Sequence, residues 1–386
     1  MNTFTYSYPV KVYFGEKAAE KNLAAELSKY GENVLLAYGG GSVKKNGIYD
    51  ELVGILKNAG KKITEFTGIM SNPTYEKVQE GARLAKENQI DFILAVGGGS
   101  VIDCCKVVSA QAKLDEDIWD FEYVQHGVPS EFIPMGAIVT AFGTGAEMNN
   151  GAVITNEEKK SKSPLWGAFY DFAVLDPDYT MTMPMKQVIS GAFDSLSHSM
   201  ETYMGSPREV NLSDEINEAT QRNIIRNIRT TLRNPDDRQA RSELVWAAAM
   251  AENGILKIGK VTDFQCHMLE HQLGAYTDCN HGQGLAVLHP ALYRHMLPEA
   301  VPQFARLAVE VWGIDASGKS EGELADAFID ALASFIKEIG LPTTFAEMGI
   351  GTDTDFKAIA ESTILTGGCV KKFTPEELCE VLEECM

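Results

Sequence analysis

The chain has 386 residues, of which 45% are hydrophobic and 23% charged, as in ordinary globular proteins. At a typical domain size of about 150 residues, this length predicts two or three domains with large cores. Because 34 Lys and Arg face 54 Asp and Glu, the formal net charge is −20. A surface this acidic repels nucleic-acid backbones and anionic lipids, so we expect neither nucleic acid nor a membrane as a partner.

The compartment is inferred from the N-terminus and the cysteines. The first residues lack the basic and apolar regions of a secretory signal, and no run of 18 apolar residues predicts a transmembrane helix. The seven cysteines are odd in number and scattered along the chain, which suits reduced thiols better than a disulfide framework. We therefore expect a cytoplasmic protein.

The first half of the chain alternates strand and helix patterns. Short apolar runs predict strands at residues 33–38, 62–66, 91–96 and 132–140. Helical spacing of apolar residues predicts intervening helices at residues 48–59, 74–87 and 101–112. Apolar strands separated by helices of this length are typical of a parallel sheet that is covered on both faces.

The second half reads as helical throughout. Amphipathic periodicity predicts helices at residues 184–204, 216–233, 241–254, 302–312 and 321–339, and no convincing strand follows residue 184. The sequence therefore predicts an α/β dinucleotide-binding domain over residues 1–183 and an all-helical domain, carrying the metal and catalytic residues, over residues 184–386.

Three glycine-rich turns follow predicted strands, at residues 39–42, 97–100 and 143–145. Ser100 and Asp103 have the spacing of a capping box, which would begin the helix after the second turn. None of the turns completes G-x-G-x-x-G, because Lys44, Ile102 and Met148 stand where the third glycine would be. Each turn alone is readily structural, but three at the carboxyl ends of parallel strands favour a nucleotide pyrophosphate site.

Five of the seven histidines fall between residues 267 and 295. His267 and His271 are four residues apart, as are Asp194 and His198 upstream, so each pair shares one helix face. His281 follows a short polar turn. One carboxylate with two or three imidazoles suits a divalent ion such as Fe²⁺ or Zn²⁺, although an Asp–His pair alone is often a simple hydrogen bond. The remaining histidines are interpreted as packing or surface residues: His126, His289 and His295.

Together these residues resemble the iron-containing (group III) alcohol dehydrogenases, specifically their NADPH-dependent butanol dehydrogenase and aldehyde reductase branch. The resemblance spans about residues 10–290 and rests on the segments 92–103, 140–149, 174–184, 191–201 and 267–287. It implies a dehydroquinate synthase-like architecture, with a parallel-sheet nucleotide-binding domain followed by an all-α domain.

The resemblance also implies roles for individual residues. The ion would be held by Asp194, His198, His267 and His281, and His271 would face the nicotinamide and relay a proton as the catalytic residue. The implied cofactor-binding residues are Gly39, Gly40, Gly41, Ser42, Gly97, Gly98, Gly99, Ser100, Asp103, Thr140, Thr144, Asn149, Lys160 and Tyr179. The lysine in this set is Lys159, Lys160 or Lys162, since the three stand close together.

Cofactor choice is inferred from residue 39. NAD-preferring relatives carry an Asp there, which binds the adenosine ribose and repels a 2′-phosphate. Gly39 removes that charge, Ser42 offers a hydroxyl, and Lys44 or Lys45 would supply positive charge. We therefore predict NADP(H) as cofactor.

The expected activity is interconversion of short-chain aldehydes and primary alcohols, such as butanal and butanol. Two alternatives remain open, namely a polyol oxidoreductase similar to glycerol dehydrogenases and a non-catalytic protein that binds nucleotide or metal. A strand at residues 10–14 would be able to pair across a two-fold axis, which predicts a homodimer.

Overall fold

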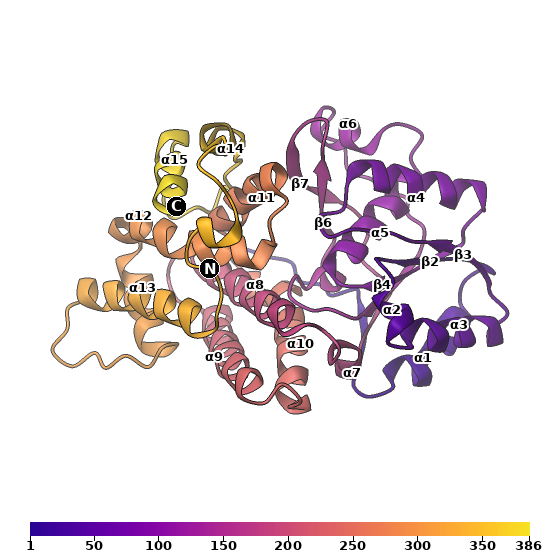
Figure 1. Ribbon diagram of the computed structural model, residues 1–386, viewed down its shortest axis with the longest axis horizontal. Helices are drawn as coiled ribbons and strands as arrows, with labels where there is room; N and C mark the ends of the chain where they lie inside the picture. Colours follow the sequence, from indigo (N-terminus) through magenta and orange to yellow (C-terminus); the bar gives the residue numbers. More distant parts are fainter. The chain divides into compact units, whose positions relative to one another are not determined.

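A computed structural model describes all residues, Met1–Met386, and contains two compact units (Figure 1). One unit is Ser7–Pro184, and the other is Met185–Met386 together with Met1–Tyr6. The first six residues were predicted to belong to the first domain, and that assignment is wrong. Their backbone is bound by the second unit instead, since the Asn2 N–H donates to the Gly259 carbonyl at 2.9 Å.

The first unit is built on a six-stranded sheet in the order β1-β8-β5-β4-β2-β3, in which every neighbouring pair is parallel. Its strands are β1 (Lys11–Phe14), β2 (Asn33–Tyr38), β3 (Lys62–Phe66), β4 (Phe92–Gly97), β5 (Met135–Val139) and β8 (Phe172–Leu175). Every residue of β4 and β5 is buried. Burial on both faces explains why these strands read as continuous apolar runs.

Helices connect the parallel strands, as such connections require. They are α1 (Ala18–Leu27), α2 (Ser42–Lys45), α3 (Ile48–Asn58), α4 (Tyr75–Glu87), α5 (Gly99–Gln111) and α6 (Ile118–Tyr123). A further helix, α7 (Pro177–Thr180), follows the last strand, β8. Helix α5 packs against β4 and α4. The predicted α/β class of the first half is confirmed.

One part of this unit was not predicted. Strands β6 (Gly151–Asn156) and β7 (Ser161–Trp166) form a separate antiparallel hairpin. Residues of β6 alternate between buried and half-buried, and β7 contains Ser163 and Pro164, so neither strand has the apolar run that marked the others.

The hairpin also explains why the predicted capping box of Ser100 and Asp103 is wrong. Helix α5 begins at Gly99 behind an N-cap glycine, Gly98, without a side-chain cap, so no capping box forms. The Asp103 carboxylate instead accepts the Val153 N–H of β6 at 3.0 Å. A partner fifty residues away cannot be read from local spacing.

The second unit contains helices and no sheet strand, which confirms its predicted all-helical class. Its α-helices are α8 (Met185–Tyr203), α9 (Leu212–Arg233), α10 (Arg238–Glu252), α11 (Gln265–Thr277), α12 (His281–Glu310), α13 (Glu321–Glu338), α14 (Phe356–Ser362) and α15 (Pro375–Glu384). Helices α8, α11 and α12, which carry the predicted ion ligands, pack against one another through α12. No helix of the chain is both long and apolar enough to cross a membrane.

One helix boundary differs from prediction. The helix expected to begin at Pro302 is the end of α12, which runs for 30 residues through Pro290, Pro298 and Pro302. Proline normally ends or kinks a helix because it lacks an N–H. In α12, apolar residues such as Leu292 are buried, and this packing stabilises the helix despite the prolines.

Candidate metal centre

Three helices bring the four predicted ligands together. Asp194 and His198 lie one turn apart on α8, His267 lies in the first turn of α11, and His281 is the first residue of α12. All are buried except His281, which is half-buried. Because Asn280 caps α12, His281 sits at the very start of that helix.

Helix α12 begins in close contact with α8. Asn280 Oδ1 accepts the Ser190 hydroxyl at 2.5 Å. A side chain at Gly282 would collide with the Ser190 carbonyl oxygen, so only glycine permits this approach. These two contacts place His281 beside Asp194.

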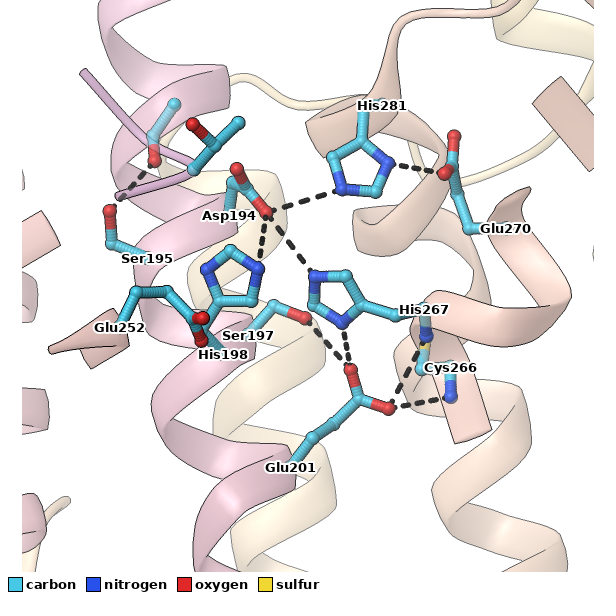
Figure 2. Close-up of polar contacts among 12 residues, drawn as sticks. Asp194, Ser195, Ser197, His198, Glu201, Glu252, Cys266, His267, Glu270 and His281 are labelled. Atoms are coloured by element: carbon cyan, nitrogen blue, oxygen red, sulfur yellow. Dashed lines mark hydrogen bonds and ion pairs between the residues drawn. The ribbon is translucent and has the colours of Figure 1, made fainter. Parts of the chain in front are cut away.

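The ligand atoms of Asp194, His267 and His281 lie within 4.8 Å of one another, and His198 lies beside Asp194 but outside this group (Figure 2). Asp194 Oδ1 lies 3.4 Å from the Nε2 atoms of His267 and His281, and 3.7 Å from that of His198. A tetrahedral ion with bonds of about 2.0–2.1 Å would hold its ligand atoms about 3.4 Å apart. Asp194 Oδ1 and His267 Nε2 are also buried without a hydrogen-bond partner. The group of Asp194, His267 and His281 therefore fits a divalent ion, with His198 as the remaining predicted ligand.

Two glutamates contact the opposite nitrogens of the ligand rings. Glu201 Oε2 accepts from His267 Nδ1, and Glu270 Oε2 accepts from His281 Nδ1 (Figure 2). Neither glutamate was identified from the sequence. Glu201 follows Asp194 by two helical turns on α8, so helical spacing did contain a signal for it.

The electrostatics of the site shift the pKa values of the ligand side chains in different directions. Although burial raises it, the electrostatic interactions with the rings of His198 and His281 hold the pKa of Asp194 well below its usual range. Burial lowers the pKa of His198 to about 4, which keeps that ring neutral. Although burial opposes the effect, the charge of Glu201 raises the pKa of His267 to about 10. A metal-free site thus holds a proton where a cation would bind.

The other histidines of the cluster are placed differently. The His271 ring centroid lies 6.1 Å from that of His267 and 5.5 Å from that of His281. His271 belongs to a second group of potential ligands, with Glu270 and His281, rather than to the group around Asp194. His289 bonds the Ser197 hydroxyl at 2.6 Å and His295 lies 3.1 Å from a Glu384 oxygen. The five histidines between residues 267 and 295 therefore do not form a single cluster in the structure.

The predicted cofactor turns gather at one edge of the sheet. Strands β5, β4 and β2 are neighbours, so their carboxyl ends lie side by side at the edge where α/β proteins bind ligands. The predicted residues at those ends are Gly39, Gly40, Gly41, Ser42, Gly97, Gly98, Gly99, Ser100 and Thr140. A side chain at Gly99 would collide with Thr144, so Thr144 packs directly on the second glycine turn.

Other predicted cofactor residues are bound within the unit. Asn149 Oδ1 accepts the Lys106 ammonium at 2.9 Å, and the Tyr179 hydroxyl donates to Glu51 at 2.7 Å. Lys160 stands in the turn of the β6–β7 hairpin with a positive φ of 47°. These contacts fix Asn149 and Tyr179 before any ligand arrives.

Comparison with known families gives consistent matches over nearly the whole chain. Residues 9–177 match the iron-containing alcohol dehydrogenase domain, and residues 188–386 match the Fe-containing alcohol dehydrogenase family, C-terminal. The chain is 38% identical to NADH-dependent butanol dehydrogenase B of Clostridium acetobutylicum, over 99% of this chain and 98% of that protein. It is 36% identical to the NADPH-dependent aldehyde reductase YqhD of Escherichia coli, over 91% and 90%.

A solved structure shares the fold closely. The structure of NADH-dependent butanol dehydrogenase A from Thermotoga maritima superposes with a TM-score of 0.93 at 33% identity, covering 100% of this chain and 99% of that one. The crystal structure of E. coli YqhD gives a TM-score of 0.90 at 32% identity, with the same coverage.

Proposed function

Because this chain belongs to the iron-containing alcohol dehydrogenase family, we propose that it interconverts short-chain aldehydes and primary alcohols with NADP(H). The substrates we propose are of the butanal and butanol type. The observation that carries the proposal is the convergence of Asp194 Oδ1 with three histidine Nε2 atoms. The names of the relatives, butanol dehydrogenase and aldehyde reductase, support the substrate class.

Each residue of the site then has a distinct task. Asp194, His198, His267 and His281 would hold Fe²⁺ or Zn²⁺, since mixed carboxylate and imidazole ligands suit both. When bound, the ion supplies a Lewis acid and the nicotinamide supplies hydride. His271 is the residue we propose to deliver the proton to the product oxygen, because it lies one turn beyond His267, in the group with Glu270 and His281.

The proposal of NADP(H) rests on charge near the glycine turn at residues 39–42. No carboxylate stands at Gly39 to repel a 2′-phosphate. Lys44 already lies 3.4 Å from Glu65, so the exposed Lys45 is the better candidate for pairing with that phosphate. The relatives include enzymes named for either cofactor. We expect kcat/KM to be at least about tenfold higher with NADPH than with NADH; equal values would contradict this preference.

The central experiment follows absorbance at 340 nm as metal-free protein is mixed with Fe²⁺ or Zn²⁺, NADPH and butanal. We expect NADPH oxidation only when the ion is present. Full activity after complete metal removal would refute the proposal. Faster turnover of glycerol than of butanol would favour a polyol oxidoreductase, and binding of both ligands without turnover would favour a non-catalytic protein.

We also propose a homodimer in the cytoplasm. Strand β1 lies at an edge of the sheet, where only β8 pairs with it, so its other edge is able to pair with a second copy. Light scattering coupled to gel filtration should give twice the monomer mass. The odd number of scattered cysteines supports a reducing compartment.

A further inference from the structure

Glu201 is a buried carboxylate that receives hydrogen bonds on both oxygens. Its Oε1 accepts the backbone N–H of Cys266 at 2.6 Å and that of His267 at 3.3 Å. Its Oε2 accepts from His267 Nδ1 and, at 3.4 Å, from the Ser197 hydroxyl. One side chain on α8 thus fixes both the backbone and the ring of His267 at the start of α11 (Figure 2).

These contacts decide where the His267 ring carries its proton. An ionised carboxylate accepts hydrogen bonds and donates none. Two backbone N–H groups and the Ser197 hydroxyl donate to Glu201, and hydrogen bonds of this kind favour the ionised carboxylate. Nδ1 must therefore be the protonated nitrogen of the neutral ring, which leaves the Nε2 lone pair directed towards Asp194 Oδ1.

We infer that Glu201 is a positioning residue that sets the tautomer and orientation of His267 for ion binding. The inference rests on the proposed ion at this site. Glu201 itself does not contact the ion position, because His267 stands between them. Glu270 makes the same contact with His281 Nδ1, and Glu201 also accepts from two backbone N–H groups.

The substitution Glu201→Gln tests the hydrogen-bonding role of Glu201 while it keeps the size and shape of the side chain. An amide has the shape of a carboxylate but one acceptor oxygen and one NH₂ donor. Because the backbone N–H groups of Cys266 and His267 can only donate, the amide oxygen of Gln must face them. The NH₂ group then faces His267 Nδ1 and makes it an acceptor. The ring proton moves to Nε2, where it blocks ion binding.

The first test compares Zn²⁺ affinity by chelator competition in metal-free wild type, Glu201→Gln and Glu218→Gln. Glu218 is the matched control, because it is a buried glutamate that bonds Tyr203 and Arg306 and no proposed ligand. We expect Glu201→Gln to bind zinc about 10–100-fold more weakly, and Glu218→Gln to stay within about twofold of wild type. Unchanged affinity in Glu201→Gln overturns the inference alone, whereas a wild type that binds no ion overturns the proposed function as well.

The second test reads the tautomer directly, and its wild-type measurement does not depend on the variant folding. In zinc-loaded wild type labelled with ¹⁵N-histidine, NMR should show every coordinated ring bound through Nε2 with a protonated Nδ1. In Glu201→Gln at saturating zinc, we expect one ring fewer to be coordinated, and that ring to carry its proton on Nε2. Coordination through Nδ1 in the wild-type protein overturns the inference, since Glu201 would then have no proton to accept.

Discussion

Lys106 offers a direct test of how the first unit positions the proposed nucleotide-binding residues. The side chain is fully buried on α5, with its ammonium 2.9 Å from Asn149 Oδ1, 2.6 Å from the Gly151 carbonyl and 3.8 Å from Asp103. It therefore links two proposed cofactor residues, Asp103 and Asn149, to the first residue of β6.

The substitution Lys106→Met keeps the apolar stem and removes the charge. Asp103 would then remain buried without this counter-ion, and the Asn149 and Gly151 oxygens would lose a donor. Breaking one side of a buried ion pair costs about 3–5 kcal/mol, a large part of a total of about 5–15 kcal/mol for a typical protein. We expect the free energy of unfolding to fall by that amount. NADPH binding should weaken at least about tenfold, because one misplaced hydrogen bond is worth about 1.4 kcal/mol.

Urea unfolding followed by circular dichroism, and fluorescence titration with NADPH, measure the two effects. Lys62→Met is the control, since Lys62 forms an exposed ion pair with Glu32 in the same unit. Such surface pairs contribute about 0–1 kcal/mol. A Lys106→Met protein that unfolds at the wild-type urea concentration would refute the reasoning, because the buried pair would then contribute no net stability.

Three further predictions concern the metal and cofactor sites. Zinc affinity should weaken as the pH falls. Because the pKa of His267 is about 10, zinc must displace a proton from that ring below this pH. The Kd for zinc should therefore rise about tenfold per pH unit from pH 8 to pH 6. A Kd independent of pH in calorimetry would contradict this, and His295→Gln should leave the slope unchanged. His271→Ala should retain wild-type metal content by elemental analysis but lower kcat by about 10²–10⁴-fold; loss of the metal would instead make His271 a ligand. Gly39→Asp should shift the ratio of kcat/KM values towards NADH, whereas Gly39→Ala should not. Both place a Cβ 2.9 Å from the Ile69 carbonyl oxygen, so they share that contact and differ by the carboxylate group.

The sequence alone was sufficient to predict features that lie within a single helix or strand. The buried strand β4 reads as an apolar run because both of its faces are covered. Asp194 and His198 can be paired from their spacing alone, because residues four apart share a helix face. The two fold classes follow from such patterns, as does the boundary between strand-rich and helical halves.

Tertiary structure alone decided the features that depend on where elements pack. Asp103 bonds the backbone of an unpredicted hairpin rather than capping its own helix. Glu201 reaches His267 only because α8 lies against the start of α11, 66 residues along the chain. The sequence thus determined which residue types are available as ligands, whereas helix packing decided which nitrogen of each ring is left to bind, since that depends on a hydrogen bond to a distant side chain.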